Sequence, residues 1–186
     1  RYYGYIQKES MRLSRLIDDL LELSRLQSGT IALTKQRMDV QEILYDVAQR
    51  YESAAQERGL SIRLNVADPF PEVYGNPDRT EQVLIILLDN AIKHGSADEP
   101  LALGAEISGD KVLVHVSNAG TIAEEDIAHL FERFYKADRS HSGEGTGLGL
   151  SIAQEIMSLL DEKIWAQNRN GRVEFTFTLS LNAEKV

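Results

Sequence analysis

The hydrophobic pattern at the start of the chain predicts a long amphipathic helix over residues 5–27, which ends before Gly29. Its apolar residues recur at steps of three and four, the spacing that places side chains on one helix face. They form a seam of Ile6, Leu13, Leu16, Leu20 and Leu23. Such a helix either packs on the globular domain that follows or belongs to a helix bundle whose other helices are absent. We favour the bundle.

Two more amphipathic segments carry helix start and stop signals. One begins at Asp39, where Glu42 follows as in a capping box, and stops near Gly59. Its expected buried stripe comprises Val40, Ile43, Leu44, Val47, Tyr51 and Ala54. The other begins at Asn76-Pro77, with Asn as N-cap and Pro as first helical residue, and reaches Gly95.

The remaining pattern alternates between strands and helices. Strands are predicted at 31–33, 60–66, 101–108, 111–117, 163–168 and 172–181, and shorter helices at 124–131 and 147–160. Gly109-Asp110 is the expected hairpin turn between the third and fourth of these strands. This order predicts an α+β fold, a two-layer sandwich in which helices cover one face of a mixed sheet, preceded by the long bundle helix.

Composition narrows the function classes. The 186 residues are 42% hydrophobic and 26% charged, as in a soluble globular protein, and the net charge of −9 argues against a nucleic-acid partner. The absence of Cys excludes disulfides and thiolate metal sites. The longest apolar run, Val83–Leu88, is far shorter than the roughly 20 residues that span a bilayer.

A glycine-rich segment, Gly145-Thr146-Gly147-Leu148-Gly149-Leu150, stands directly before a predicted helix. Alternating glycines allow the backbone to approach a ligand, and the helix N-terminus offers free N–H groups and a positive dipole end. The segment is therefore a candidate phosphate site, although a flexible connector would have the same composition.

Polar residues interrupt the hydrophobic helix before Gly95. Asn90, Lys93 and His94 share one helix face because they lie three and four residues apart. An amide oxygen is a hard ligand suited to magnesium, and Lys adds positive charge for phosphates. The alternative is a helix end that turns towards solvent.

Two further segments are candidates for ligand binding or for anchoring a loop. Asn118-Ala119-Gly120 ends a predicted strand, where a side-chain amide next to a glycine turn could read the edge of a base. Phe131–Lys136 could anchor the loop behind it through its aromatic residues.

In this order and spacing, the four segments resemble the N box, the first glycine box, the F box and the second glycine box of histidine-kinase catalytic domains. That fold is shared with gyrase, the heat-shock chaperone and the mismatch-repair ATPases. Residues 14–29 resemble the second helix of the dimerisation and histidine-phosphotransfer domain. The resemblance implies a truncated phosphotransfer helix at 1–29 and an ATP-binding catalytic domain at 30–186.

The resemblance also implies residue roles. Asn90 would hold the magnesium ion that bridges the ATP phosphates, Lys93 and Lys136 would contact those phosphates, and Asn118 would read the adenine amino group. Residues 135–144 would form the mobile ATP lid. The other expected nucleotide-binding residues are His94, Gly120, Gly145, Thr146, Gly147, Leu148 and Gly149.

The chain departs from the family pattern at several positions. Ile86 replaces the first Asn of the N box, and Lys136 replaces a more usual Arg. Asn118 stands where most of the family has Asp, and the segment after it is one residue short, so the base-reading role could fall to Ser117 instead. None of the four histidines, His94, His115, His129 and His141, lies on the first helix, where the family's bundle would be.

The resemblance implies a kinase that uses Mg²⁺ and ATP to phosphorylate a histidine outside this chain, and from there an aspartate of a response regulator. It implies a homodimer through the first helix, and a cytoplasmic chain whose parent could be anchored at the inner face of the membrane. The rival is a degenerate nucleotide-binding scaffold or dimerisation module, which Ile86, Asn118 and Lys136 favour. A gyrase-type ATPase is disfavoured, because Ile86 stands where its acidic base would be.

Overall fold

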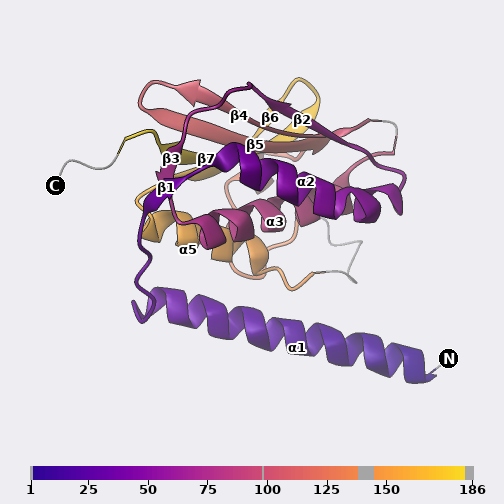
Figure 1. The fold of residues 1–186 in the computed structure, drawn as a ribbon. Helices are drawn as coiled ribbons and strands as arrows, with labels where there is room; N and C mark the ends of the chain where they lie inside the picture. Colours follow the sequence, from indigo (N-terminus) through magenta and orange to yellow (C-terminus); the bar gives the residue numbers. More distant parts are fainter. Residues whose placement is uncertain (1, 98, 138–144, 183–186) are drawn as a thin grey trace.

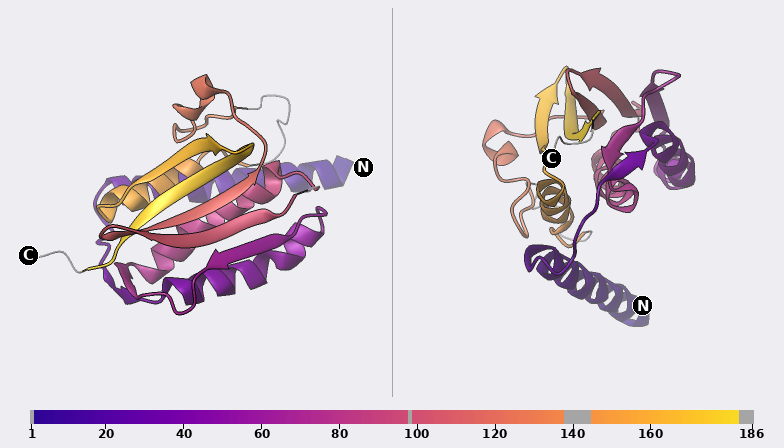
Figure 2. Two further views of the ribbon diagram at one scale, coloured as in Figure 1. Left: turned by 90° about the horizontal axis from the view of Figure 1, so that it is seen from above. Right: turned by 60° about the vertical axis from the view of Figure 1, so that its left-hand side comes forward.

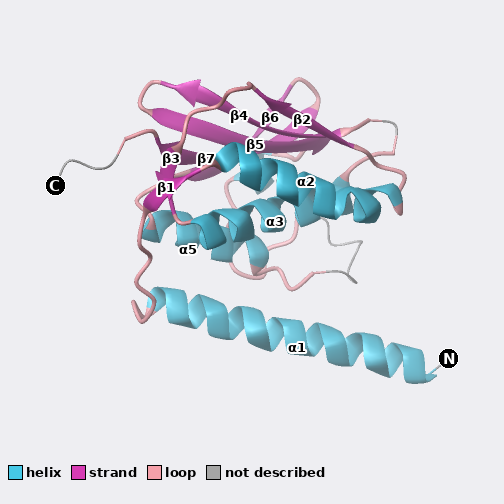
Figure 3. Ribbon diagram, in the orientation of Figure 1, coloured by secondary structure: helices cyan, strands magenta, loops and turns pink. Residues whose placement is uncertain are grey.

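The computed structural model describes residues 2–97, 99–137 and 145–182. A mixed sheet forms one layer, helices α2, α3 and α5 cover one of its faces, and the long helix α1 lies beyond them (Figures 1 and 3). The helices are α1 Tyr2–Gln27, α2 Val40–Gln56, α3 Pro77–His94, α4 Glu124–Ile127 and α5 Gly149–Leu159. The strands are β1 Gln36–Met38, β2 Ile62–Val66, β3 Val73–Gly75, β4 Leu101–Ser108, β5 Lys111–Ala119, β6 Ile164–Arg169 and β7 Arg172–Ser180. The predicted α+β sandwich is confirmed.

The sheet places β5 and β7 at its centre. Its strands follow the order β1-β3-β7-β5-β4-β2, with β6 also paired to β7. Only the β2–β4 pair is parallel among the described strands, so the sheet is mixed. The core fills the space between this sheet and the helices, and its largest fully buried side chains include Phe175, Phe177, Leu84, Leu87 and Leu88. Figure 2 shows the two layers from two further directions, with α1 outermost.

Asp39 and Asn76 act as the N-caps that the sequence predicted. The Asp39 carboxylate accepts a hydrogen bond from the Glu42 backbone N–H at 3.0 Å, at the N-terminus of α2. The Asn76 side chain accepts one from the Arg79 backbone N–H at 3.0 Å, with Pro77 as the first residue of α3. These caps satisfy N–H groups that have no partner within the helix. The Asn76 cap fixes where α3, the helix that carries the candidate site, begins.

Several local predictions were wrong. The helix predicted at 124–131 ends at Ile127 and continues as turns. Residues 31–33 form no strand, because no neighbouring strand pairs with them in the described part of the chain; the paired strand is β1, which joins β3. The buried alanine near the end of α2 is Ala55, whereas Ala54 is exposed, so the predicted stripe is wrong at its last position only. Helix α5 begins at Gly149 and not at 147, since Gly147 has a positive φ of 78°.

Helix α1 begins at Tyr2, before the predicted residue 5, and ends at Gln27 as predicted. Only part of its seam packs on the globular domain, and the bundle stays a prediction. The C-terminal part of α1 packs on α5, with Leu23 and Leu26 buried. Towards the N-terminus the seam is open to solvent, where Ile6 is 61%, Leu13 57% and Leu20 41% exposed. The helix is therefore docked on the layer formed by α2, α3 and α5 at one end only. Across the residues that the structure describes, no helix is both long enough and apolar enough to cross a membrane.

A buried carboxylate ties the end of α5 to the sheet. Glu162 accepts hydrogen bonds from Lys111 Nζ at 2.8 Å, Thr178 Oγ1 at 2.6 Å and Ser180 Oγ at 2.6 Å. Burial raises the pKa of Glu162, but these hydrogen bonds lower it by more, so its pKa in the folded protein lies below the ordinary 4.5. The charged form of Glu162 therefore stabilises the fold.

Replacing Glu162 by Gln should lower the free energy of unfolding by about 1–3 kcal/mol at pH 7, because the two hydroxyls and the ammonium lose their charged acceptor. A lowered pKa stabilises the folded state above the unfolded value near 4.5, and this contribution disappears as the pH falls through the folded value. In urea unfolding, the difference in the free energy of unfolding between wild type and Glu162→Gln should therefore become smaller below pH 4.5. The exposed Glu106→Gln is the control; an equal loss in both variants would contradict the assignment.

Candidate functional site

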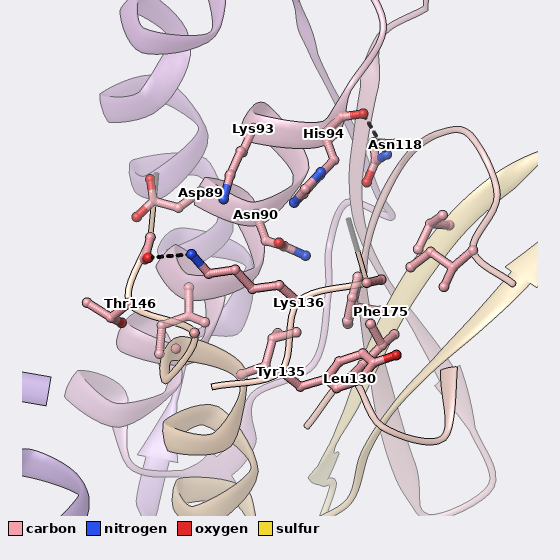
Figure 4. Close-up of a pocket in the computed structure, with 18 of the residues that line it drawn as sticks. Asp89, Asn90, Lys93, His94, Asn118, Leu130, Tyr135, Lys136, Thr146 and Phe175 are labelled. Atoms are coloured by element: carbon pink, nitrogen blue, oxygen red, sulfur yellow. Dashed lines mark hydrogen bonds between the residues drawn. The ribbon is translucent and has the colours of Figure 1, made fainter. Parts of the chain in front are cut away.

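A cavity of about 740 Å³ lies beside α3 and opens between the two layers (Figure 4). Its walls come from α3, the end of β5 with residues 119–123, residues 135–137, the glycine-rich segment and one side of α1. Pockets for small ligands typically measure about 300–1,000 Å³. The cavity therefore has the volume of a site for a small ligand.

Helix α3 contributes the polar wall. Asn90, Lys93 and His94 all line the cavity, as their spacing predicted, and so do Ile86 and Asp89. The Asn90 carboxamide is half-buried and has no hydrogen-bond partner among the residues that the structure describes. Partial burial raises the pKa of Asp89, although this side chain still reaches solvent. An unpaired amide in a polar pocket is the arrangement that a ligand or metal ion would complete.

The two ends of the cavity differ in chemistry. Figure 4 shows the amino groups of Lys93 and Lys136 on the same side as Asp89, and His94 and Asn118 on the other side. Lys136 Nζ donates to the Gly145 carbonyl at 3.1 Å, which places this cation against the glycine-rich segment. The lysine end therefore suits an anionic group, and the Asn118 end a neutral polar one.

Asn118 is 3% exposed, at the end of β5. Its Nδ2 donates to the Ala119 carbonyl at 3.0 Å and, more distantly, to the His94 carbonyl at 3.5 Å. The side chain of Ser117 belongs to the opposite face of the strand, where its Oγ accepts from Arg172 Nε at 3.0 Å. The structure thus brings Asn118, and not Ser117, to the cavity.

The glycine-rich segment packs directly on the F-box segment. The Phe134 N–H donates to the Gly147 carbonyl at 2.8 Å. A Cβ atom at Gly147 would lie 2.9 Å from Phe134 Cα, so only glycine fits there. Gly145, Thr146, Gly147 and Gly149 line the cavity. Leu148 does not line it, because its side chain is fully buried in the core, and its contact with nucleotide stays a prediction.

Helix α5 begins beside the cavity without a side-chain cap. As in every α-helix, the first N–H groups have no partner within the helix, and the helix dipole is positive at this end. The Leu148 N–H is satisfied by Thr146 Oγ1 at 3.3 Å. Of the predicted lid, residues 138–144, which include His141, lie outside the described residues.

Gly120 lines the cavity as predicted. The aromatic residues of the F-box segment anchor it to the rest of the domain. Phe131 meets Phe175 edge to face at 6.2 Å between ring centroids. The Tyr135 hydroxyl donates to Asp126 Oδ1. These contacts fix the backbone on which Lys136 stands.

Sequence reasoning missed the contribution of α1. Asp18, Asp19 and Glu22 line the cavity, and Thr146 Oγ1 donates to Asp19 Oδ2 at 2.5 Å. Glu22 also pairs with Arg79 of α3. The charged face beside the seam was visible in the sequence, but only the docked position of α1 shows which of its carboxylates reach the site.

Comparisons with known proteins place this architecture in one class. Sensor protein VanS of Enterococcus faecium is 29% identical over 181 residues, which are 96% of this chain and 47% of VanS. The solved structure of full-length ShkA in complex with AMPPNP superposes with a TM-score of 0.83 at 27% identity, covering 98% of this chain and 39% of that one. Histidine kinase ThkA, in complex with response regulator protein TrrA, gives a TM-score of 0.81 at 27% identity, covering 100% of this chain and 52% of that one.

Together with the fold and the cavity, these likenesses define the class: the catalytic domain of a sensor histidine kinase. The chain belongs to the family of histidine kinase-, DNA gyrase B- and HSP90-like ATPases, whose family model matches residues 75–183. It spans about half the length of VanS, so the relatives contain further sequence that this chain does not represent.

Proposed function

We propose that the cavity binds Mg²⁺ and ATP, and that the intact protein transfers the γ-phosphoryl group to a histidine on its helix bundle and then to an aspartate of a response regulator. The observation that carries the proposal is a single cavity with Asn90, Lys93 and Lys136 at one end and Asn118 at the other. The complexes of ShkA with AMPPNP and of ThkA with a response regulator support it.

The residues present fit magnesium through Asn90, whose amide oxygen is a hard donor inside the cavity and has no partner in the part of the chain that the structure describes. The ion would supply charge neutralisation between the phosphates. Lys93 and Lys136 would bind the phosphate oxygens, and the N-terminus of α5 would add its positive dipole end. Asn118 would accept from the adenine amino group through its side-chain oxygen. Catalysis would then rest on positioning and charge compensation, the general logic of phosphoryl transfer.

The acceptor would lie outside this chain. His94 ends α3, His115 belongs to β5 and His129 follows α4, so none of these three stands on α1. Labelled ATP should therefore give no phosphohistidine on this chain alone, and an acid-labile phosphoryl group on the parent protein. A parent that binds ATP but never becomes labelled would favour the degenerate scaffold, for which the aliphatic Ile86 in the cavity wall is the specific observation.

We further propose that α1 forms a homodimer contact through the open part of its seam. Burying each exposed leucine or isoleucine would contribute roughly 1.5–3 kcal/mol before entropy costs. The mass in solution should rise with concentration for the wild type. The double variant Leu13→Glu and Leu20→Glu should keep the mass of a monomer at every concentration. The mass of Tyr45→Glu, which changes a similarly exposed residue on α2, should still rise with concentration. A wild type that is monomeric at high concentration would contradict this role of α1.

A further inference from the structure

The segment between β5 and α4 is held by a side chain from another part of the sheet. The Ile122 N–H donates to Asn168 Oδ1 at 3.0 Å, and Asn168 Nδ2 donates to the Ile122 carbonyl at 2.7 Å. One carboxamide thus satisfies both backbone groups of one residue, as a neighbouring strand would. Asn168 Nδ2 also lies 3.3 Å from Glu124 Oε1, in the first turn of α4.

Asn168 shares a row of the sheet with Asn118. In the strand register, Asn118 of β5 pairs with Val173 of β7, and Val173 pairs with Asn168 of β6. Directly paired residues point to the same face of a sheet. Val173 itself lines the cavity, so Asn168 stands on the cavity face, two strands away from Asn118.

The segment that Asn168 holds forms one wall of the cavity. Residues 119–123 all line it, and they follow Asn118 directly in the chain. The β5–β7 ladder ends with Ala119 paired to Arg172. Beyond that ladder, the only backbone–backbone hydrogen bond from residues 120–122 to the hairpin of β6 and β7, among the described residues, runs from the Gly120 N–H to the Gly171 carbonyl at 3.0 Å. Without Asn168, both backbone groups of the half-buried Ile122 would lose their partner.

We propose that Asn168 is a positioning residue for the adenine end of the cavity: it fixes the shortened segment after Asn118 and thereby sets the preference for adenine over guanine. This inference rests on the proposed ATP site. The residue acts through Ile122 and touches no ligand itself. Its side-chain hydrogen bonds go to Ile122 and Glu124, and not to Lys93, Lys136 or the glycine-rich segment, among the described residues.

The test uses the 186-residue chain, with ATP and GTP titrated by calorimetry in the presence of magnesium. Asn168→Ala should weaken ATP binding about tenfold, as expected for two unsatisfied backbone groups at the wall. GTP binding should change about twofold or less, so the ATP-to-GTP ratio falls. Asn168→Asp can accept from the Ile122 N–H but cannot donate to its carbonyl, so it should also lower the ratio while keeping the side-chain volume.

Gln167→Ala is the matched control. Gln167 is the neighbour of Asn168 on β6, and its Nε2 donates to Glu174 Oε1 at 2.9 Å without touching residues 119–123. The control should lower the melting temperature about as much as Asn168→Ala and leave the ATP-to-GTP ratio unchanged. An unchanged ratio in both Asn168 variants, or an equal fall in Gln167→Ala, overturns the inference while the ATP site stands. A wild type that binds no ATP removes both.

Discussion

Replacing Asn90 by alanine is expected to weaken ATP binding in magnesium by roughly five- to 150-fold, which corresponds to about 1–3 kcal/mol. The amide is half-buried, lines the cavity, and has no partner within the described residues. Its oxygen would become a ligand only when magnesium and nucleotide are present. Its loss therefore removes a contact from the complex and almost no contact from the free protein. Calorimetry should show weaker binding with an unchanged melting temperature.

The control for this change is Asn65→Ala, on β2. Asn65 is exposed and does not line the cavity, so its replacement should leave ATP affinity as it is. In EDTA the difference between wild type and Asn90→Ala should shrink, because the proposed ligand role requires the metal. Equal ATP affinity of Asn90→Ala and wild type in magnesium would exclude Asn90 as a ligand.

Replacing Gly147 by alanine should damage both the fold and the site. Its φ of 78° costs an alanine about 1–2 kcal/mol. The added Cβ would meet the Phe134 backbone at 2.9 Å, and overpacking adds about 1–3 kcal/mol. Because Phe134 precedes Tyr135 and Lys136, the shift that relieves this clash should move both cavity residues. We expect at least a roughly tenfold loss of ATP affinity together with lower stability.

Gly109→Ala separates the two effects. Gly109 has a φ of 63° and lies in the turn between β4 and β5, and a Cβ atom added there would have open space for 4 Å around it. This variant should therefore lose only the stability that corresponds to the positive φ of an alanine, and its ATP affinity should not change. If Gly147→Ala resembled Gly109→Ala in both measurements, the close packing of the glycine-rich segment on Phe134 would have no role in binding.

The sequence predicted the elements whose ends are marked by local chemistry. Helix α3 begins where Asn76 caps it and Pro77 follows, and the β4–β5 hairpin turns at Gly109. By contrast, β1 and β3 have three residues each, and they form because β1 pairs with β3 and β3 pairs with β7. Such short strands carry no periodic signal, so their position depends on contacts that are distant in the sequence.

Local spacing in the sequence also predicted part of the candidate site, whereas the rest depended on contacts between distant elements. The helical spacing of Asn90, Lys93 and His94 required that they share a face, and the structure places all three at the cavity. The choice between Asn118 and Ser117 needed the strand register, because adjacent strand residues point to opposite faces. Leu148 and the carboxylates of α1 needed the packing of whole elements: Leu148 turns into the core, whereas Asp19 reaches Thr146 from the docked helix.

The most direct test of the proposed ATP site is a calorimetric titration of the wild-type chain with ATP, in magnesium and again in EDTA. We predict saturable binding of one ATP per chain in magnesium and clearly weaker binding in EDTA, because Asn90 and the phosphates would share the ion. Competition by ADP and weak binding of GTP should accompany it. Absence of ATP binding in magnesium, or equal affinity with and without the metal, would contradict the account.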